Sequence, residues 1–340
     1  MPLRNLQQVN YLPVLAISNA EMAALEHLPN ARKDTILPLF RLKRWGASHD
    51  LANTEQRIHR AYGNRPYIGD VAPATPFNGP RQNVHNQLDA LRDPTNGYVN
   101  WCQYASQHPA MIPAIQLGDL TQVGLQIQRL EALGRGLAVY IPPQMSARIA
   151  NIAALLAQHV KNQNELVFVI DLGAVNQTLL LSQATTTSYV NSALAAIPTM
   201  SVAVSASSFP QGFVGLVNQV IYERQHFQGV ANNTASRLIY SDHGSARAGS
   251  QAKGGGKPAP RIDLPERQQW NFFRSNGGSG SIAQQYQQQA ANALAAYSTI
   301  PVGVWGFDQV RITASGSANA ISNPVASTAA RINMHLYEQS

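Results

Sequence analysis

The chain has 340 residues, enough for one large α/β domain with a substantial core, and its 44% hydrophobic content excludes global disorder. Charged residues make up only 13%, and the net charge of +7 reflects scarce acids as much as abundant bases. Arginine carries most of the positive charge, which suits recognition of phosphate or carboxylate groups and equally suits general solubility. A single cysteine excludes an intramolecular disulfide and a cysteine-based structural zinc site, and the absence of a signal-peptide pattern or a long apolar run predicts a cytoplasmic protein.

Short apolar runs alternate with helical patterns through most of the chain. The predicted strands are 11–17, 36–42, 66–70, 111–116, 136–141, 166–171, 200–205 and 238–241. Bare apolar strands separated by helices predict a parallel sheet covered on both faces. The count of eight and the spacing favour an α/β fold of the (β/α)8 TIM-like barrel class, with a doubly wound open sheet as the alternative.

Helical spacing of apolar residues fills the intervals between these strands. The predicted helices include 20–28, 120–133, 147–161, 188–196 and 213–224.

The regular alternation ends after residue 244, so residues 1–244 are predicted to form the barrel core and 245–340 an addition packed on it. A loop at 245–258 carries Lys253, Gly254–Gly256 and Lys257 and no acid, which suits a basic flap over an anion or a plain linker. The runs 261–264 and 270–274 predict a C-terminal β-hairpin, and 279–297 a final helix. The tail at 329–337 suits a last strand or a docking segment.

Four short stretches together carry a resemblance to a known family. They are Tyr11-Leu-Pro-Val-Leu, Ile36-Leu-Pro-Leu-Phe, Ser241-Asp-His-Gly-Ser with Pro260-Arg-Ile-Asp, and Ala330-Arg-Ile-Asn-Met-His. The set resembles the phage and bacterial "beta protein" family of mobile elements. Its members usually carry an acid after the Pro-Leu pair of the second strand, where this chain has Arg41 nearby. The resemblance implies the fold and a phage or mobile-element setting, and it assigns no activity.

Polar residues follow several predicted strands, where barrels of this class place their sites. Asp171, Asp242 and His243 are the candidate catalytic residues. Carboxylates and imidazole bind divalent metals, so a metal is a candidate cofactor, although the sequence selects none. Each aspartate also suits a cap or turn, and adjacent residues on a strand point to opposite sides, so Asp242 and His243 cannot both face the mouth if the strand continues through them.

Basic and aromatic residues supply the candidate ligand contacts. Arg41, Lys43 and Asp70 end the second and third strands, and guanidinium and ammonium groups neutralise phosphate oxygens. Arg261 and Trp270 belong to the predicted hairpin, which could stack bases and hold phosphates. Packing of the same aromatics on the barrel is the competing interpretation.

Three functions are compatible with these patterns. The first is binding of a phosphate-containing or nucleotide-like ligand at the strand ends, with metal-assisted hydrolysis as one version. The second is a non-enzymatic protein that binds nucleic acid or a protein partner in a phage or host-defence assembly, and the third is a structural component. The sequence does not decide whether the chain is an enzyme, and it predicts no membrane partner.

Overall fold

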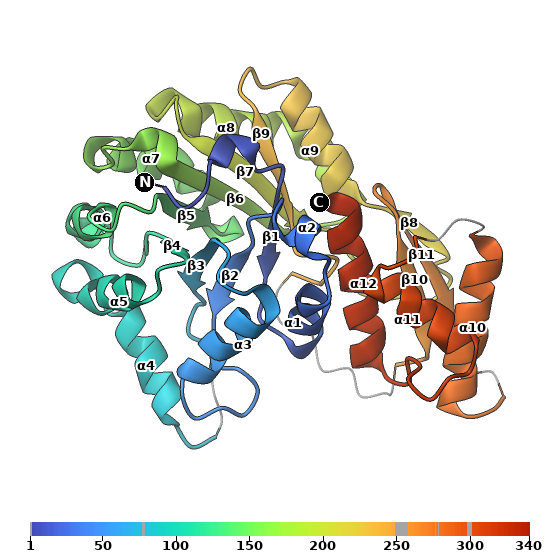
Figure 1. Cartoon of the computed structure of the whole chain (residues 1–340). Coiled ribbons are helices and arrows are strands. Elements are labelled where there is room, and N and C mark those ends of the chain that lie inside the picture. The colour runs from blue at the N-terminus through green and yellow to red at the C-terminus, as the bar shows by residue number, and fades with distance from the viewer. Residues whose placement is uncertain (1, 77–78, 249–257, 276, 278, 298–300) are drawn as a thin grey trace.

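The computed structural model describes residues 2–76, 79–248, 258–275, 277, 279–297 and 301–340. Within these ranges, eight parallel strands form one sheet in the order β4-β3-β2-β1-β9-β7-β6-β5 (Figure 1). The strands are β1 Tyr11–Leu15, β2 Leu39–Leu42, β3 Tyr67–Val71, β4 Met111–Pro113, β5 Leu137–Ile141, β6 Leu166–Ala174, β7 Ser201–Ser207 and β9 Leu238–Asp242. An isolated parallel bridge between Ala114 and Ala138 joins the two edges, so the sheet is nearly closed into a barrel. All eight strands predicted from apolar runs are present.

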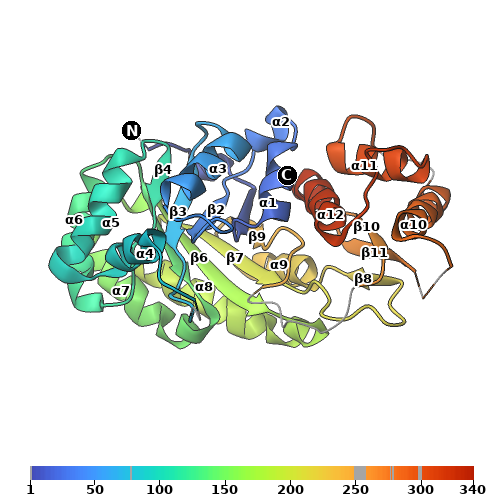
Figure 2. The same cartoon turned by 90° about the horizontal axis from the view of Figure 1, so that it is seen from below.

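Helices surround this sheet (Figures 1 and 2). They are α1 Asn19–Glu26, α2 Asn30–Lys33, α3 Ala52–Tyr62, α4 Asn83–Arg92, α5 Thr95–Gln107, α6 Val123–Glu131, α7 Ile149–His159, α8 Gln183–Ala196 and α9 Tyr222–Asn232. Short 3₁₀ turns lie at Leu6–Gln8, Leu120–Gln122, Pro143–Arg148, Gln163–Glu165 and Gln177–Ser182.

The strands are buried on both faces, which explains their continuous apolar sequences. Side chains alternate along a strand, and they divide here into two cores. The inner core holds every second residue, such as Val167 and Val169 of β6 and Ala203 of β7. The outer core, under the helices, holds the residues between them, such as Phe168 and Val202.

The C-terminal part of the chain forms a separate unit beside the barrel, drawn in orange and red (Figure 2). Strands β10 Arg261–Pro265 and β11 Gln269–Arg274 pair antiparallel, and β11 also pairs with β8 Asn218–Val220. Helices α10 Ile282–Ala296, α11 Trp305–Ala314 and α12 Pro324–Gln339 cover this sheet. We call residues 258–340 the C-terminal unit.

Two sequence predictions are wrong in this region. Residues 213–224 are not one helix, because the segment contains β8 and α9 begins only at Tyr222. Gly215 has a φ of +70°, which interrupts a helix, and Phe213 packs with Trp270 and Phe272 rather than on the barrel. The strand alternative for the tail also fails, since 329–337 lies inside α12. Asn323 caps that helix through Ala326 N, and Pro324 occupies its first turn.

Most of the predicted basic loop, including Lys253, Gly254–Gly256 and Lys257, lies outside the described residues. Helix 279–297 is present as α10, but α11 and α12 follow it. In the described part of the chain, none of the helices combines the length and the apolar character needed to span a bilayer.

Candidate functional site

Polar side chains continue the inner face of the barrel at the carboxyl ends of the strands. Residues 68, 112, 140, 167 and 169 belong to the inner core, and the alternation places the next inward positions beyond it. These inward positions hold Arg41, Asp70, Gln116, Asp171 and His243, and together with Tyr140 at the rim of the inner core we call them the mouth residues. Polar residues at the ends of several strands therefore lie together at one end of the barrel.

Arg41 and Asp70 form an ion pair between neighbouring strands. Arg41 Nε donates to Asp70 Oδ2 at 3.1 Å, and Gln116 Nε2 donates to Asp70 Oδ1 at 3.0 Å. The Arg41 guanidinium also lies over the Tyr140 ring, 4.5 Å from its centroid. Burial disfavours the charged guanidinium, but the carboxylate of Asp70 raises the pKa of Arg41 above its usual value.

Asp171 is bound from three sides. The Tyr140 hydroxyl donates to Asp171 Oδ2, Gly173 N donates to Oδ1 at 2.9 Å, and His243 Nε2 lies 3.0 Å from Oδ1. Burial alone would raise the pKa of Asp171, but the charge of His243 and these hydrogen bonds hold it below its usual value. Burial likewise opposes protonation of His243, and the Asp171 carboxylate nevertheless raises the pKa of His243. The pair is therefore an ionised acid next to an imidazole that favours its charged form.

Asp242 faces the other side of the sheet. It accepts hydrogen bonds from the hydroxyls of Tyr11 (2.6 Å) and Tyr240 (2.9 Å) and from Gly244 N (2.8 Å), and His335 Nε2 of α12 lies 2.7 Å away. Burial would raise the pKa of Asp242, but His335 and the hydrogen bonds lower it to about 2. The adjacent residues Asp242 and His243 thus lie on opposite faces of the sheet: Asp242 faces outward to α12, and His243 lies at the mouth.

A second buried ion-pair group lies in the C-terminal unit. Asp263 accepts from Arg261 at 2.5 and 2.9 Å and from Arg331 Nη1 at 2.8 Å, and Arg331 Nε donates to the Ser245 carbonyl at 3.1 Å. Both Asp263 and Arg331 are almost completely buried. Together with the Asp242–His335 pair they form what we call the buried junction, which ties α12 to the end of β9.

The remaining predicted ligand residues lie in different surroundings. Lys43 is half-buried, and among the described residues its ammonium has no ion-pair partner. Arg261 is paired with Asp263 and stacks on Phe213 at 3.4 Å. Trp270 is fully buried and packs edge-on against Phe209. Neither Arg261 nor Trp270 is part of the mouth.

Metal ligation was the other chemistry that the aspartates suggested. Across the described ranges, no group of three or more His, Cys, Asp or Glu side chains is close enough together to hold a metal ion. Asp70, Asp171 and Asp242 each have their own cationic partner, and Asp242 points away from the other two. They are not arranged as shared ligands of one ion.

Comparison with known proteins shows the family of the chain. The sequence model of the family described as "Beta protein" matches residues 11–340. The chain belongs to the Beta protein family. "Protein beta" of Enterobacteria phage P4 is 27% identical over 346 residues, an alignment that covers 98% of this chain and 93% of that protein. The resemblance expected from short motifs therefore extends along almost the whole length.

The motifs that carry the Beta protein resemblance meet in space. Tyr11 of the first stretch and His335 of the last both contact Asp242 of the third. Arg331 of the last stretch pairs with Asp263 and reaches the Ser245 carbonyl. The first and last stretches are separated by more than three hundred residues of sequence, yet the first, third and last all contact the buried junction. Their contacts join the C-terminal unit to the barrel.

The sequence reasoning missed the partners supplied by α12. Arg331 and His335 are four residues apart, a spacing that puts both side chains on one helical face. That spacing was the available signal. It has this meaning only in a helix, whereas the sequence of the tail alone suits a strand or a docking segment.

Proposed function

We propose that the mouth residues bind an anionic small molecule, phosphate-containing or nucleotide-like, at the carboxyl ends of the strands. The observation that carries the proposal is the chain of contacts from Arg41 over Tyr140 to Asp171 and His243, which holds two cationic groups on the inner face of the sheet. We also propose that the sheet is a TIM-type (β/α)8 barrel. The bridge between Ala114 and Ala138 and the 2.8 Å hydrogen bond from Ile115 N to Ala138 O support that assignment.

Arg41 is the principal anion contact in this proposal. Its Nε donates a hydrogen bond to Asp70, and the face of its guanidinium packs on the Tyr140 ring. Its terminal nitrogens have no hydrogen bond to any described residue. A fixed guanidinium with free terminal N–H groups matches the oxygens of a phosphate. Lys43 directly follows the last residue of β2, and in this proposal it adds a further positive charge at the same strand end.

His243 is the proton-transfer group in the enzymatic version of the proposal. With Nε2 directed at Asp171, Nδ1 is the nitrogen that exchanges a proton with a ligand or water. In hydrolysis of a phosphate anhydride, the charged His243 would give its Nδ1 proton to the departing phosphate as the P–O bond breaks, and it would take a proton back from the water that forms the new P–O bond. No step is assigned to a metal, because the described side chains provide no cluster of ligands for one.

Calorimetric titration with inorganic pyrophosphate tests the binding site. The double variant R41Q/K43Q should bind pyrophosphate at least about tenfold more weakly than the wild type, because it lacks two positive charges of the proposed binding site. The matched control R148Q/K161Q removes two charges from exposed positions elsewhere and should retain wild-type affinity. Equal affinity in all three proteins would reject the mouth as the anion site.

Phosphate release from the same pyrophosphate separates enzyme from binding protein. Under the enzymatic version, the wild type releases phosphate. H243N should still bind pyrophosphate through Arg41, although more weakly, and at saturating pyrophosphate it should release phosphate at least about a hundredfold more slowly. The assay is run with and without Mg²⁺. Binding without release in either condition would reject the hydrolase and leave the ligand-binding function.

A further inference from the structure

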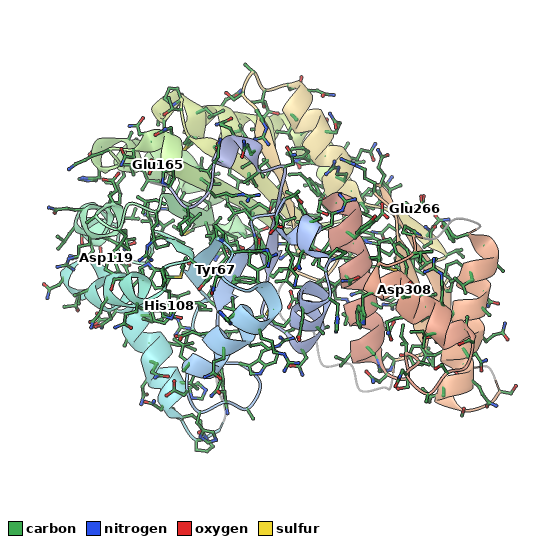
Figure 3. All side chains as sticks on the ribbon, in the orientation of Figure 1. Tyr67, His108, Asp119, Glu165, Glu266 and Asp308 are labelled. Atoms are coloured by element: carbon green, nitrogen blue, oxygen red, sulfur yellow. The ribbon has the colours of Figure 1, made fainter. Side chains whose placement is uncertain are left out.

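A second cavity lies away from the mouth, between α9 and the turn that joins β10 to β11. Its volume is about 690 Å³, within the range of small-molecule sites, and it is lined by Arg224 of α9 and by Arg267 of the turn. Glu266, labelled in Figure 3, marks its edge on the C-terminal unit. The cavity is therefore formed jointly by the barrel and the C-terminal unit.

The two arginines of this cavity contrast with three other arginines of the molecule. Arg41, Arg261 and Arg331 each form an ion pair with an aspartate. Within the described residues, neither Arg224 nor Arg267 has a carboxylate within ion-pair distance. Glu266 lines the cavity, but its Oε1 accepts from Asn271 Nδ2 at 2.9 Å.

Arg224 is held in place without being neutralised. Its guanidinium lies over the Tyr240 ring, 4.2 Å from the centroid, and the Tyr240 hydroxyl is directed to Asp242. Burial, together with the charge of Arg267, lowers the pKa of Arg224. The two guanidiniums thus repel each other across the cavity, and an anion between them would relieve that repulsion.

The rest of the lining is rich in glutamine. Gln225, Gln228, Gln268 and Gln269 all contribute, and an amide can both donate to and accept from a hydroxyl group. Gln228 Nε2 is occupied by Asn232 at 3.0 Å, which leaves its carbonyl oxygen as an acceptor. Aromatic side chains are missing from the described lining, so a stacked nucleobase is not the group that these walls fit.

We propose that this cavity binds a phosphorylated, hydroxyl-bearing small molecule, with the phosphate between Arg224 and Arg267 and the hydroxyls against the glutamine amides. The site is distinct from the mouth, because it shares no residue with it. It is built from α9 and the segment around Glu266, which the fold brings together only when the C-terminal unit is docked.

Phosphorus NMR and calorimetry with glycerol 3-phosphate test this site. The wild type should bind glycerol 3-phosphate, and both R224Q and R267Q should weaken binding at least about tenfold. R148Q is the matched control, since Arg148 is exposed and lies outside the cavity, and it should bind as the wild type does. R267Q keeps the test decisive if R224Q misfolds, because Arg267 is exposed and stacks on no described ring.

Further ligands and variants separate the alternatives. Glycerol should not bind, and inorganic phosphate should bind more weakly than glycerol 3-phosphate, because the hydroxyl contacts are absent. The mouth variant R41Q/K43Q should leave this binding unchanged, so failure of one site is distinguishable from failure of the other. Unaltered affinity in R267Q, or equal affinity for inorganic phosphate and glycerol 3-phosphate, would overturn the proposal.

Discussion

Asp242 and His243 show what the alternation of side chains along a strand can and cannot predict. Alternation along a strand correctly indicated that the two side chains serve opposite faces. It could not indicate which side each takes, because that depends on contacts from β6 and α12, remote in sequence. Asp171 meets His243 at 3.0 Å, and His335 meets Asp242 at 2.7 Å. The type of each residue was informative, whereas its partner was set by the fold.

Glu223 is a buried acid close to this cluster, and it provides a test by pH. Burial, together with the charge of Asp242, raises its pKa to about 7, although hydrogen bonds from Ser208 oppose the shift. The folded protein keeps the proton to higher pH than the unfolded chain does. The contribution of Glu223 to stability is therefore lost as pH rises from about 4.5 to 7, by up to about 3 kcal/mol for a shift of this size.

The variant E223Q should remove this dependence. Urea unfolding at a series of pH values should show E223Q gaining stability relative to the wild type between pH 5 and 8, by about 1–3 kcal/mol. E165Q, in the short turn before β6, controls for the loss of one carboxylate and should show no such gain. A difference between E223Q and wild type that is the same at pH 5 and pH 8 would contradict a protonated Glu223.

At the scale of elements, α12 explains how the C-terminal unit is attached. Ile332 and Leu336 on one stripe join the outer core of the barrel. Ala330 and Met334 on a second stripe join the core of the C-terminal unit. The polar pair Arg331 and His335 lies on a third stripe, directed at the two aspartates of the buried junction. A helix buried on three sides needs apolar and paired polar residues together, and its sequence therefore lacks a simple one-sided pattern.

The contact between α11 and α12 depends on the absence of a side chain at Gly306. A Cβ there would lie 2.4 Å from the Ala330 carbonyl oxygen and 2.6 Å from Met334 Cγ, and Gly306 N donates to Asn333 Oδ1. We expect G306A to lower the free energy of unfolding by about 1–3 kcal/mol, because backbone atoms must move apart. G212A is the control, since a Cβ at Gly212 meets nothing within 4 Å. Chemical denaturation measures both, and equal stability of G306A and wild type would show that the helices tolerate separation.

For the whole molecule, the sequence predicted the eight strands better than the C-terminal unit. Most barrel strands are largely apolar, because both faces of the sheet are buried, and such runs are visible without any partner. Strand β8 is three residues, Asn218–Val220, mostly exposed, and it exists because β11 pairs with it. The mouth could be anticipated from strand ends, but the cavity between Arg224 and Arg267 could not, since its two walls come from different units.

The division at residue 244 proposed from the sequence has a testable consequence for stability. Residues 1–244 include β8 without β11, and Asp242 without His335. They also leave uncovered the face of α1 that packs against α12 (Figure 1). A chain of residues 1–244 alone would expose that apolar face to water. It would also leave the Asp242 carboxylate without its cationic partner, and the two losses together cost several kcal/mol of stability. We expect it to lack a cooperative thermal transition, as followed by near-ultraviolet circular dichroism.

Co-expression of 1–250 with 251–340 provides the matching control. The two fragments together contain every contact of the buried junction, so they should associate and restore a cooperative transition close to that of the intact chain. Association would attribute the failure of 1–244 to the missing unit rather than to the chain break. A cooperative transition of 1–244 at the melting temperature of the full chain would instead show that the barrel is an independent domain.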